Sequence, residues 1–105
     1  MDDAMRTRLE ELVTRHKIVL FMKGSMHFPM CGFSAKTVAV LRSYGVEFNT
    51  VNVLADPAIR EGIKEFGNWP TIPQLYVNGE LVGGCDIVSD LHDAGQLASR
   101  LGVAA

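Results

Sequence analysis

The sequence predicts an α/β protein in which helices flank a mixed sheet of four strands. Three observations predict it. An uninterrupted apolar run at 18–22 is typical of a strand buried on both faces. Amphipathic helix patterns lie before and after that run, and an Asn78-Gly79 turn separates two short apolar runs further along. The resulting order, α-β-α-β-α-β-β-α, fits one domain of 105 residues, and we expect residues 1–105 to form it.

The composition excludes several classes of function. A formal net charge of −2 gives no support to nucleic-acid binding, and no stretch has the apolar length of a membrane span. Two cysteines in a chain of this size do not form a disulfide scaffold, which indicates a reducing compartment. The first residues lack the apolar segment of a signal peptide. We therefore expect a cytoplasmic protein, or one of an organelle matrix if a presequence has been removed.

The first half of the chain contains a strand at 17–22 between two helices. Either Asp2 or Asp3 caps the first helix. Its apolar side chains form one stripe, at Met5, Leu9, Leu12 and Val13. The second helix starts directly after Cys31 and extends to about Tyr44. Cys31 is therefore expected at a strand–loop–helix junction.

The third helix follows a second strand. Residues 47–53 alternate between apolar and polar side chains, as a half-buried strand does. Asp56 then provides an N-cap and Pro57 the first helical position. The buried stripe of this helix is predicted at Ile59, Ile63 and Phe66.

The last third of the chain combines an irregular segment, a hairpin and a helical region. Residues 69–73 contain too much proline for a helix or a central strand. A hairpin over 74–82 follows, turning at the Asn-Gly pair. We expect Asp86 to cap the final helical region and Gly95 to divide or kink it.

The position of Cys31 predicts a reactive thiol. The start of a helix presents unpaired N–H groups and the positive end of the helix dipole, and both stabilise a thiolate. The alternative is a buried, inert cysteine, which is common for free cysteines. Ser34 stands where a Cys-x-x-Cys protein has its second thiol, so this chain cannot resolve a mixed disulfide internally at this site. A reaction at Cys31 would need a thiol from outside the chain.

Four motifs, in order, resemble those of monothiol glutaredoxins, which have the thioredoxin fold. They are Lys23-Gly24, Cys31-Gly-Phe-Ser34, Trp69-Pro-Thr-Ile-Pro73 and Gly83-Gly-Cys-Asp86. The resemblance covers about residues 5–102. One departure is visible in the loop before the cysteine, where Met26 stands in place of a proline that is frequent in the family.

The resemblance implies glutathione as the outside thiol and assigns residues to it. Glutathione carries two carboxylates and one amine, so cations and N–H groups should meet it at both ends. The implied contacts are Lys23, Arg60 and Lys64 at one end, the backbone N–H groups of Cys85 and Asp86 with the Asp86 side chain at the other, and the backbone at Ile72-Pro73 between them. The resemblance also implies a cis bond before Pro73, opposite Cys31.

Other residues near the predicted site have more than one interpretation. We expect Cys85 to contact glutathione through its backbone, although a disulfide with Cys31 is the alternative if the two thiols approach closely enough. Trp69 is interpreted as a packing residue at the edge of the cleft. The histidines fit no ligand spacing with the cysteines, and His27, though close to Cys31 in sequence, is expected to be solvated.

A ligand count leads from the site to a function. A [2Fe–2S] cluster takes four ligands, mostly thiolates. Cys31 supplies one, a bound glutathione a second, and a second copy of each completes the set. The count and the resemblance together predict a labile cluster bridging a homodimer that is monomeric without it. BolA-type proteins and iron–sulfur recipient proteins are further partners implied by the resemblance.

Three functions therefore stay open from the sequence. The first is a carrier or assembly factor for iron–sulfur clusters, with Cys31 as metal ligand. The second is a glutathione-dependent oxidoreductase of at most weak activity, with Cys31 as catalytic nucleophile. The third is a redox-inactive interaction domain, in which Cys31 is unreactive and glutathione does not bind.

Overall fold

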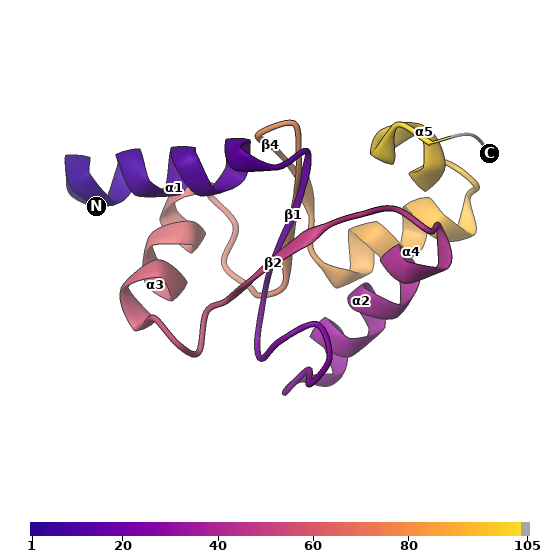
Figure 1. Cartoon of the computed structure of the whole chain (residues 1–105), viewed down its shortest axis with the longest axis horizontal. Coiled ribbons are helices and arrows are strands. Elements are labelled where there is room, and N and C mark those ends of the chain that lie inside the picture. Colours follow the sequence, from indigo (N-terminus) through magenta and orange to yellow (C-terminus); the bar gives the residue numbers. More distant parts are fainter. Residues whose placement is uncertain (104–105) are drawn as a thin grey trace.

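The computed structural model describes residues 1–103 and confirms a four-stranded mixed sheet flanked by helices (Figure 1). The helices and strands are α1 (Asp3–Arg15), β1 (Ile18–Met22), α2 (Gly32–Ser43), β2 (Asn49–Asn52), α3 (Pro57–Phe66), β3 (Gln74–Val77), β4 (Glu80–Gly83), α4 (Cys85–Asp93) and α5 (Leu97–Leu101). None of the helices in the described part of the chain has the length and apolar character needed to cross a membrane.

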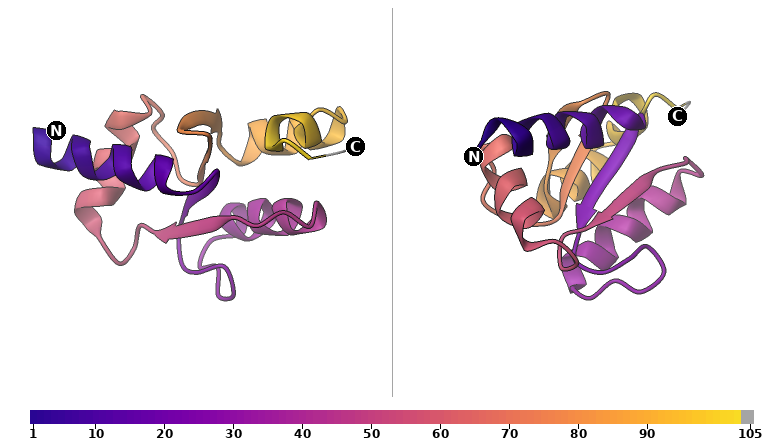
Figure 2. Two further views of the ribbon diagram at one scale, coloured as in Figure 1. Left: turned by 45° about the horizontal axis from the view of Figure 1, so that its top comes forward. Right: turned by 60° about the vertical axis from the view of Figure 1, so that its left-hand side comes forward.

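The sheet is built around β1, which lies inside it and is buried on both faces as predicted. The strand order is β2-β1-β3-β4; β1 runs parallel to β2 and antiparallel to β3, and β3 is antiparallel to β4. Helices α1 and α3 cover one face, and α2, α4 and α5 cover the other (Figures 1 and 2). Two separate apolar clusters result, one on each face of the sheet.

Alternate residues of β1 enter different clusters. Leu20 and Met22 pack with residues of α2 and α5, whereas Val19 and Phe21 pack with residues of α1 and α3. All four have at most 1% of their surface exposed. This two-sided burial explains why the run has no polar alternation. The buried run ends at Met22, and the loop that leads to Cys31 starts there.

The predicted cap of the last helical region is wrong by two residues. Helix α4 begins at Cys85, its N-cap is Gly84, and Asp86 lies in the first turn. The helix begins before Asp86 because the Gly84 carbonyl already accepts the first helical hydrogen bond, from Val88 N–H at 3.0 Å. Position 84 is also closely packed, since a Cβ there would lie 3.1 Å from Trp69 Nε1 and 3.2 Å from the carbonyl oxygen of Pro73. The predicted division at Gly95 is confirmed, since α4 ends before it and α5 begins after it.

Helix α3, which carries two of the predicted site residues, starts at the expected cap. The Asp56 carboxylate accepts hydrogen bonds from the N–H groups of Ala58 at 3.1 Å and Ile59 at 3.2 Å. The other oxygen of Asp56 forms an ion pair with Arg8 of α1 at 3.2 Å. Pro57 needs no donor at the first helical position. The carboxylate thus joins the start of α3 to α1.

Replacing Asp56 tests which of these two contacts matters more. Asp56→Ala should lower the free energy of unfolding by about 1 kcal/mol, because the first turn loses its cap. Asp56→Asn keeps the cap and removes the charge, and should cost less, because exposed ion pairs contribute little. Urea unfolding of the three proteins measures the difference. Equal losses for Ala and Asn would assign the effect to the ion pair with Arg8 instead.

Candidate functional site

A single cleft of about 390 Å³ contains all the predicted site residues. Its walls come from the residue after β1, from the start of α2, from α3, from the 69–73 loop and from the start of α4. The predicted residues that line it are Lys23, Cys31, Arg60, Lys64, Ile72, Pro73, Cys85 and Asp86. The fold therefore brings together positions that are far apart in the sequence.

Cys31 is the N-cap of α2, and its side chain is partly exposed. The backbone N–H of Ser34 is the main reason that the pKa of the Cys31 thiol lies below its ordinary value. Partial burial opposes this shift, while the N–H of Phe33, the Ser34 hydroxyl and the charge of Lys23 add to it. The prediction of a lowered pKa at a helix start thus agrees with the geometry, and the thiolate is favoured by local donors.

Ser34 has a structural role as well as an electrostatic one. It is completely buried, and its Oγ accepts a hydrogen bond from the backbone N–H of Lys23 at 3.1 Å. The hydroxyl therefore joins the end of β1 to the first turn of α2. Because Ser34 holds no thiol, the site contains one accessible sulfur at the helix start, that of Cys31.

The loop between β1 and Cys31 is closed by its own backbone. Met30 N–H donates to the Lys23 carbonyl at 2.9 Å, and Ser25 and Phe28 exchange hydrogen bonds at 3.2 Å. Gly24 N–H donates to Asn52 Oδ1 at 3.0 Å, which joins the loop to β2. These bonds hold the residues before Cys31 as a compact turn.

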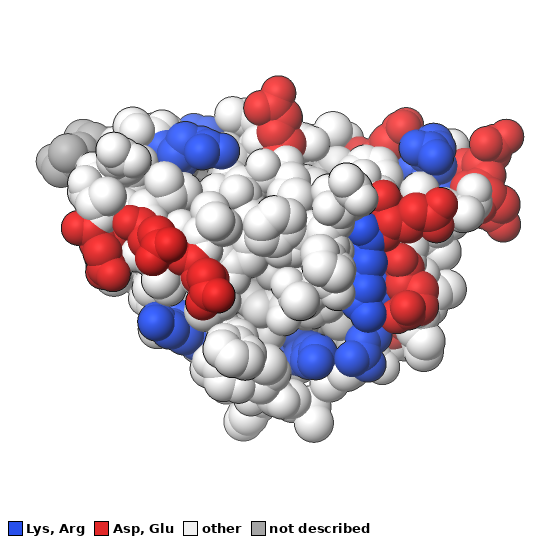
Figure 3. Space-filling view, turned by 180° about the vertical axis from the view of Figure 1, so that it is seen from behind, with Lys and Arg blue, Asp and Glu red and all other residues white. Residues whose placement is uncertain are grey.

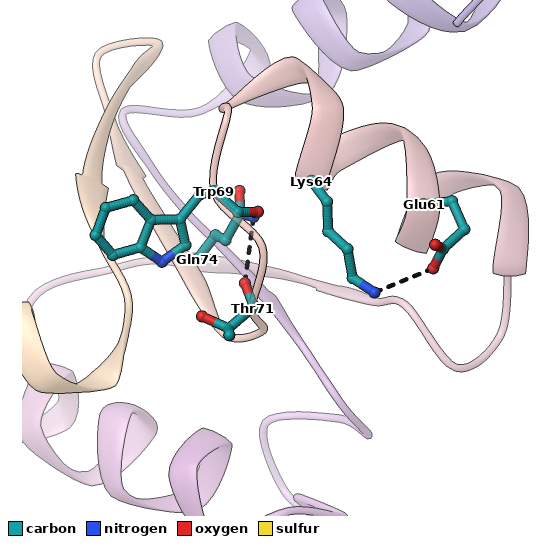
Figure 4. Close-up of polar contacts among 5 residues, drawn as sticks. All are labelled: Glu61, Lys64, Trp69, Thr71 and Gln74. Atoms are coloured by element: carbon teal, nitrogen blue, oxygen red, sulfur yellow. Dashed lines mark hydrogen bonds and ion pairs between the residues drawn. The ribbon is translucent and has the colours of Figure 1, made fainter.

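Charge is divided across the face that carries the cleft. Figure 3 shows positive side chains at the lower centre and right, toward α3, with negative side chains beside those at the right, and a separate row of negative side chains at the left, toward α4. Asp86, Asp90 and Asp93 are spaced so that they share one face of α4. Lys64 already has an ion-pair partner, since its Nζ lies 3.1 Å from Glu61 Oε2 (Figure 4). The structure therefore presents cations and an acidic helix start on opposite walls.

Arg60 is a cation without a partner of its own in this region. Its Nε is buried and has no hydrogen-bond partner within residues 1–103. No ion pair to Arg60 occurs among the described residues either. An anion at the cleft would meet a guanidinium that is not already neutralised.

The 69–73 segment forms the wall opposite the start of α2. The Ile72–Pro73 bond is cis, as the resemblance implies, and both residues are buried. Trp69 is half-buried at the cleft, in agreement with its interpretation as a packing residue. Five other lining residues were given no role at the site from the sequence: Phe33, Pro70, Thr71 and Gly84, which lie inside the quoted motifs, and Ile87, which directly follows one.

Large apolar side chains close to Cys31 in the sequence form an exposed apolar rim beside the cleft. Phe28 is 78% exposed, Met30 70% and Phe33 62%, although all three are large apolar residues. Ile87, at the start of α4, is 37% exposed. Large exposed apolar side chains of this kind are more frequent on surfaces that bind another molecule than on the rest of a protein surface.

The remaining candidates contribute less to the site. Cys85 is buried and lines the cleft as a free cysteine, so the choice between a backbone contact and a disulfide stays open. His27 is exposed and outside the cleft lining, and His92 is hydrogen-bonded to the Tyr44 hydroxyl at 2.6 Å. Within residues 1–103, no group of three or more His, Cys, Asp or Glu could hold a metal ion. A metal at Cys31 would need ligands from outside this chain.

Comparisons with known proteins agree on one family. The glutaredoxin family model matches residues 18–82. An uncharacterized monothiol glutaredoxin ycf64-like from Synechocystis is 51% identical over 104 residues, covering 99% of this chain and 97% of that protein. Monothiol glutaredoxin-S11 of rice is 55% identical over 96 residues, covering 91% of this chain but only 20% of the rice protein.

Solved structures show the same fold. The solution structure of reduced poplar apo GrxS14 is 46% identical with a TM-score of 0.83, and the match covers 93% of this chain and 90% of that one. A crystal structure of a buckwheat glutaredoxin–glutathione complex has a TM-score of 0.80 at 21% identity, with both chains fully covered. At that identity the buckwheat protein supports the fold alone.

The pH dependence of alkylation tests the account of Cys31. In a Cys85→Ser background, the rate of reaction with iodoacetamide should rise with pH at a lower midpoint in the native protein than in urea, because the folded-state pKa is lowered. Ser34→Ala removes one of the groups that lower this pKa and should move the native midpoint to higher pH. Ser43→Ala removes a hydroxyl at the other end of α2 and should not move it. Equal midpoints in native and unfolded protein would contradict the role of the helix start.

Proposed function

Because the chain belongs to the glutaredoxin family, as one of its monothiol members, we propose that it binds glutathione and carries a labile [2Fe–2S] cluster between proteins. The observation that carries the proposal is the cleft: one thiol with a lowered pKa, no second thiol at Ser34, and oppositely charged walls on either side. The cluster would be cargo that the protein passes on, not a resident cofactor.

The chemistry of the cleft fits glutathione at both of its ends. Lys23, Arg60 and Lys64 would receive one carboxylate. At the other wall, the first N–H groups of α4 have no side-chain cap and suit the second carboxylate, while the Asp86 carboxylate suits the amine. The thiol of glutathione would then lie near Cys31. A glutaredoxin of the same fold, from buckwheat, has been crystallised with glutathione.

The ligand count supports a shared cluster. One chain offers Cys31 and one bound glutathione, which is half of the four ligands that a [2Fe–2S] cluster takes. A second copy with its own glutathione would complete the set. Because two of the four ligands are not covalently part of the protein, the cluster should be released readily to a recipient protein. A BolA-type protein could take the place of the second copy.

The apolar rim supports a partner at this face. Phe28, Met30 and Phe33 lie close in the sequence to the thiol that would hold the cluster, and each is more than half exposed. A second copy placed against the cleft would remove this surface from water. The rim therefore favours a site that is completed by another chain over a site that works alone.

A second function, glutathione-dependent reduction of mixed disulfides, is favoured by the lowered pKa of Cys31. The Cys31 thiolate would attack the glutathione sulfur of a protein–glutathione disulfide, and the protein thiol would leave. A second glutathione would then attack the Cys31–glutathione disulfide, which restores Cys31 and releases oxidised glutathione. Each step exchanges one disulfide for another, with glutathione as the reductant.

Anaerobic reconstitution with iron, sulfide and glutathione tests the carrier function. We expect visible absorbance that requires glutathione, at about half a cluster per chain, with dimer formation in sedimentation. Cys31→Ser should abolish the absorbance, because it removes the only protein ligand. Cys85→Ser, the matched control, should retain it.

Four results would change the assignment. Retained cluster in Cys31→Ser would show that the ligand is wrongly assigned, and loss in Cys85→Ser would make that thiol a ligand. Failure to hold iron, together with turnover of a glutathione mixed disulfide, would favour the oxidoreductase. An unreactive Cys31 with no glutathione binding would leave an interaction domain.

A further inference from the structure

A buried polar pair lies behind the 69–73 loop. Gln74 and Tyr76 share one face of β3, with 0% and 1% of their surface exposed. Gln74 follows the cis Ile72–Pro73 bond directly. Neither residue lines the cleft, so neither can touch a ligand there. Two hydrogen-bonding side chains in a core position need an explanation, because burial of polar groups is unfavourable unless they are paired.

The partners of Gln74 and Tyr76 determine which atom donates and which accepts in each hydrogen bond. Gln74 Nε2 donates to the carbonyl oxygens of Trp69 at 2.9 Å and Thr71 at 3.2 Å (Figure 4). Carbonyl oxygens only accept, so the amide nitrogen must face the loop and Gln74 Oε1 must face Tyr76. The Tyr76 hydroxyl donates to that oxygen at 2.9 Å. Burial raises the pKa of Tyr76 to about 12, so the donor keeps its proton at neutral pH.

Packing fixes Tyr76 from three sides. Its ring meets Phe21 of β1 edge-on, with centroids 5.5 Å apart, and Phe66 of α3 at 6.2 Å. At the end of α3, a Cβ on Gly67 would collide with the Tyr76 hydroxyl and would lie 3.1 Å from Gln74 Oε1. The chain therefore closes over the pair only because residue 67 is glycine. Residues of β1, the end of α3 and the strand residue that holds the loop all contact the Tyr76 side chain.

We propose that Gln74 and Tyr76 are positioning residues that hold the 69–73 loop in the shape that receives glutathione; this inference rests on the proposed function. The loop connects α3 to β3 and carries cleft-lining residues from Trp69 to Pro73. Two of its carbonyls are bound by one amide. Without that amide, both carbonyls would have to find water, and the loop would have to move away from β3 to reach it.

The test removes the polar groups of Gln74 and Tyr76 and keeps the volume of each side chain nearly unchanged. Gln74→Met should weaken glutathione binding on the order of tenfold, because two loop hydrogen bonds are lost. Tyr76→Phe should weaken it less, since the amide keeps its bonds to the loop. The pH profile of Cys31 alkylation without glutathione should stay that of the parent, because the first turn of α2 sets that acidity. A general loss of structure would change both readouts.

Trp69 provides a readout that needs no ligand. It is the single tryptophan of the chain, and its carbonyl is bound by Gln74. Acrylamide should quench its fluorescence more strongly in Gln74→Met than in the parent. Tyr44→Phe is the matched control, because it removes a hydrogen-bonded tyrosine hydroxyl outside the cleft and should alter neither quenching nor affinity.

The outcomes separate this proposal from the proposed function. Parent-like affinity or parent-like quenching in folded Gln74→Met would overturn the positioning role, as would an equal loss of affinity and Cys31 reactivity. If Gln74→Met does not fold, Tyr76→Phe replaces it: a loss of affinity smaller than about tenfold supports the role of the pair, and parent-like affinity would overturn it. Absence of glutathione binding in the parent would overturn the proposed function and the glutathione part of this inference. The quenching comparison would still decide whether Gln74 holds the loop.

Discussion

The burial of β1 on both faces is the constraint on which the rest of the structure depends. A five-residue apolar strand inside the sheet needs cover on two sides, and α1 with α3 provides one cover while α2 with α4 and α5 provides the other. The cleft lies where these two layers and the sheet come to an end together. Cys31 comes from one layer, Arg60 and Lys64 from the other, and Pro73 from the loop that enters the sheet beside β1.

The chemistry of the cleft comes largely from backbone groups. The N–H of Ser34 is the leading cause of the lowered pKa of Cys31, and the first N–H groups of α4 have no side-chain cap. Side chains then add charge and shape to these fixed donors. Unpaired N–H groups at a helix start favour a negative charge whatever the side chains, and both α2 and α4 begin at the cleft without a side-chain cap.

Most of the fold and the membership of the site could be predicted from the sequence, because the signals are local or carried by motifs. Apolar periodicity located the helices, Asn78-Gly79 located the hairpin, and Asp56-Pro57 located the start of α3. The predicted cap of α4 was wrong because the Gly84 carbonyl already accepts the first helical hydrogen bond, and the packing of Gly84 against Trp69 and Pro73 is not visible in the sequence. Gln74 was missed for a similar reason: its hydrogen-bond partners become visible only when the loop is folded back over β3.

Two of the features that sequence reasoning missed contact the same loop. Gly84 is packed against Trp69 on one side of it, and Gln74 binds the Trp69 and Thr71 carbonyls on the other. The loop has no helix or strand of its own, so contacts with its neighbours have to define its shape. Cys31 and the cations determine which chemistry is possible at the cleft. In our proposal the Trp69–Pro73 loop positions glutathione against these groups, and the loop itself is hydrogen-bonded to Gln74 in the core.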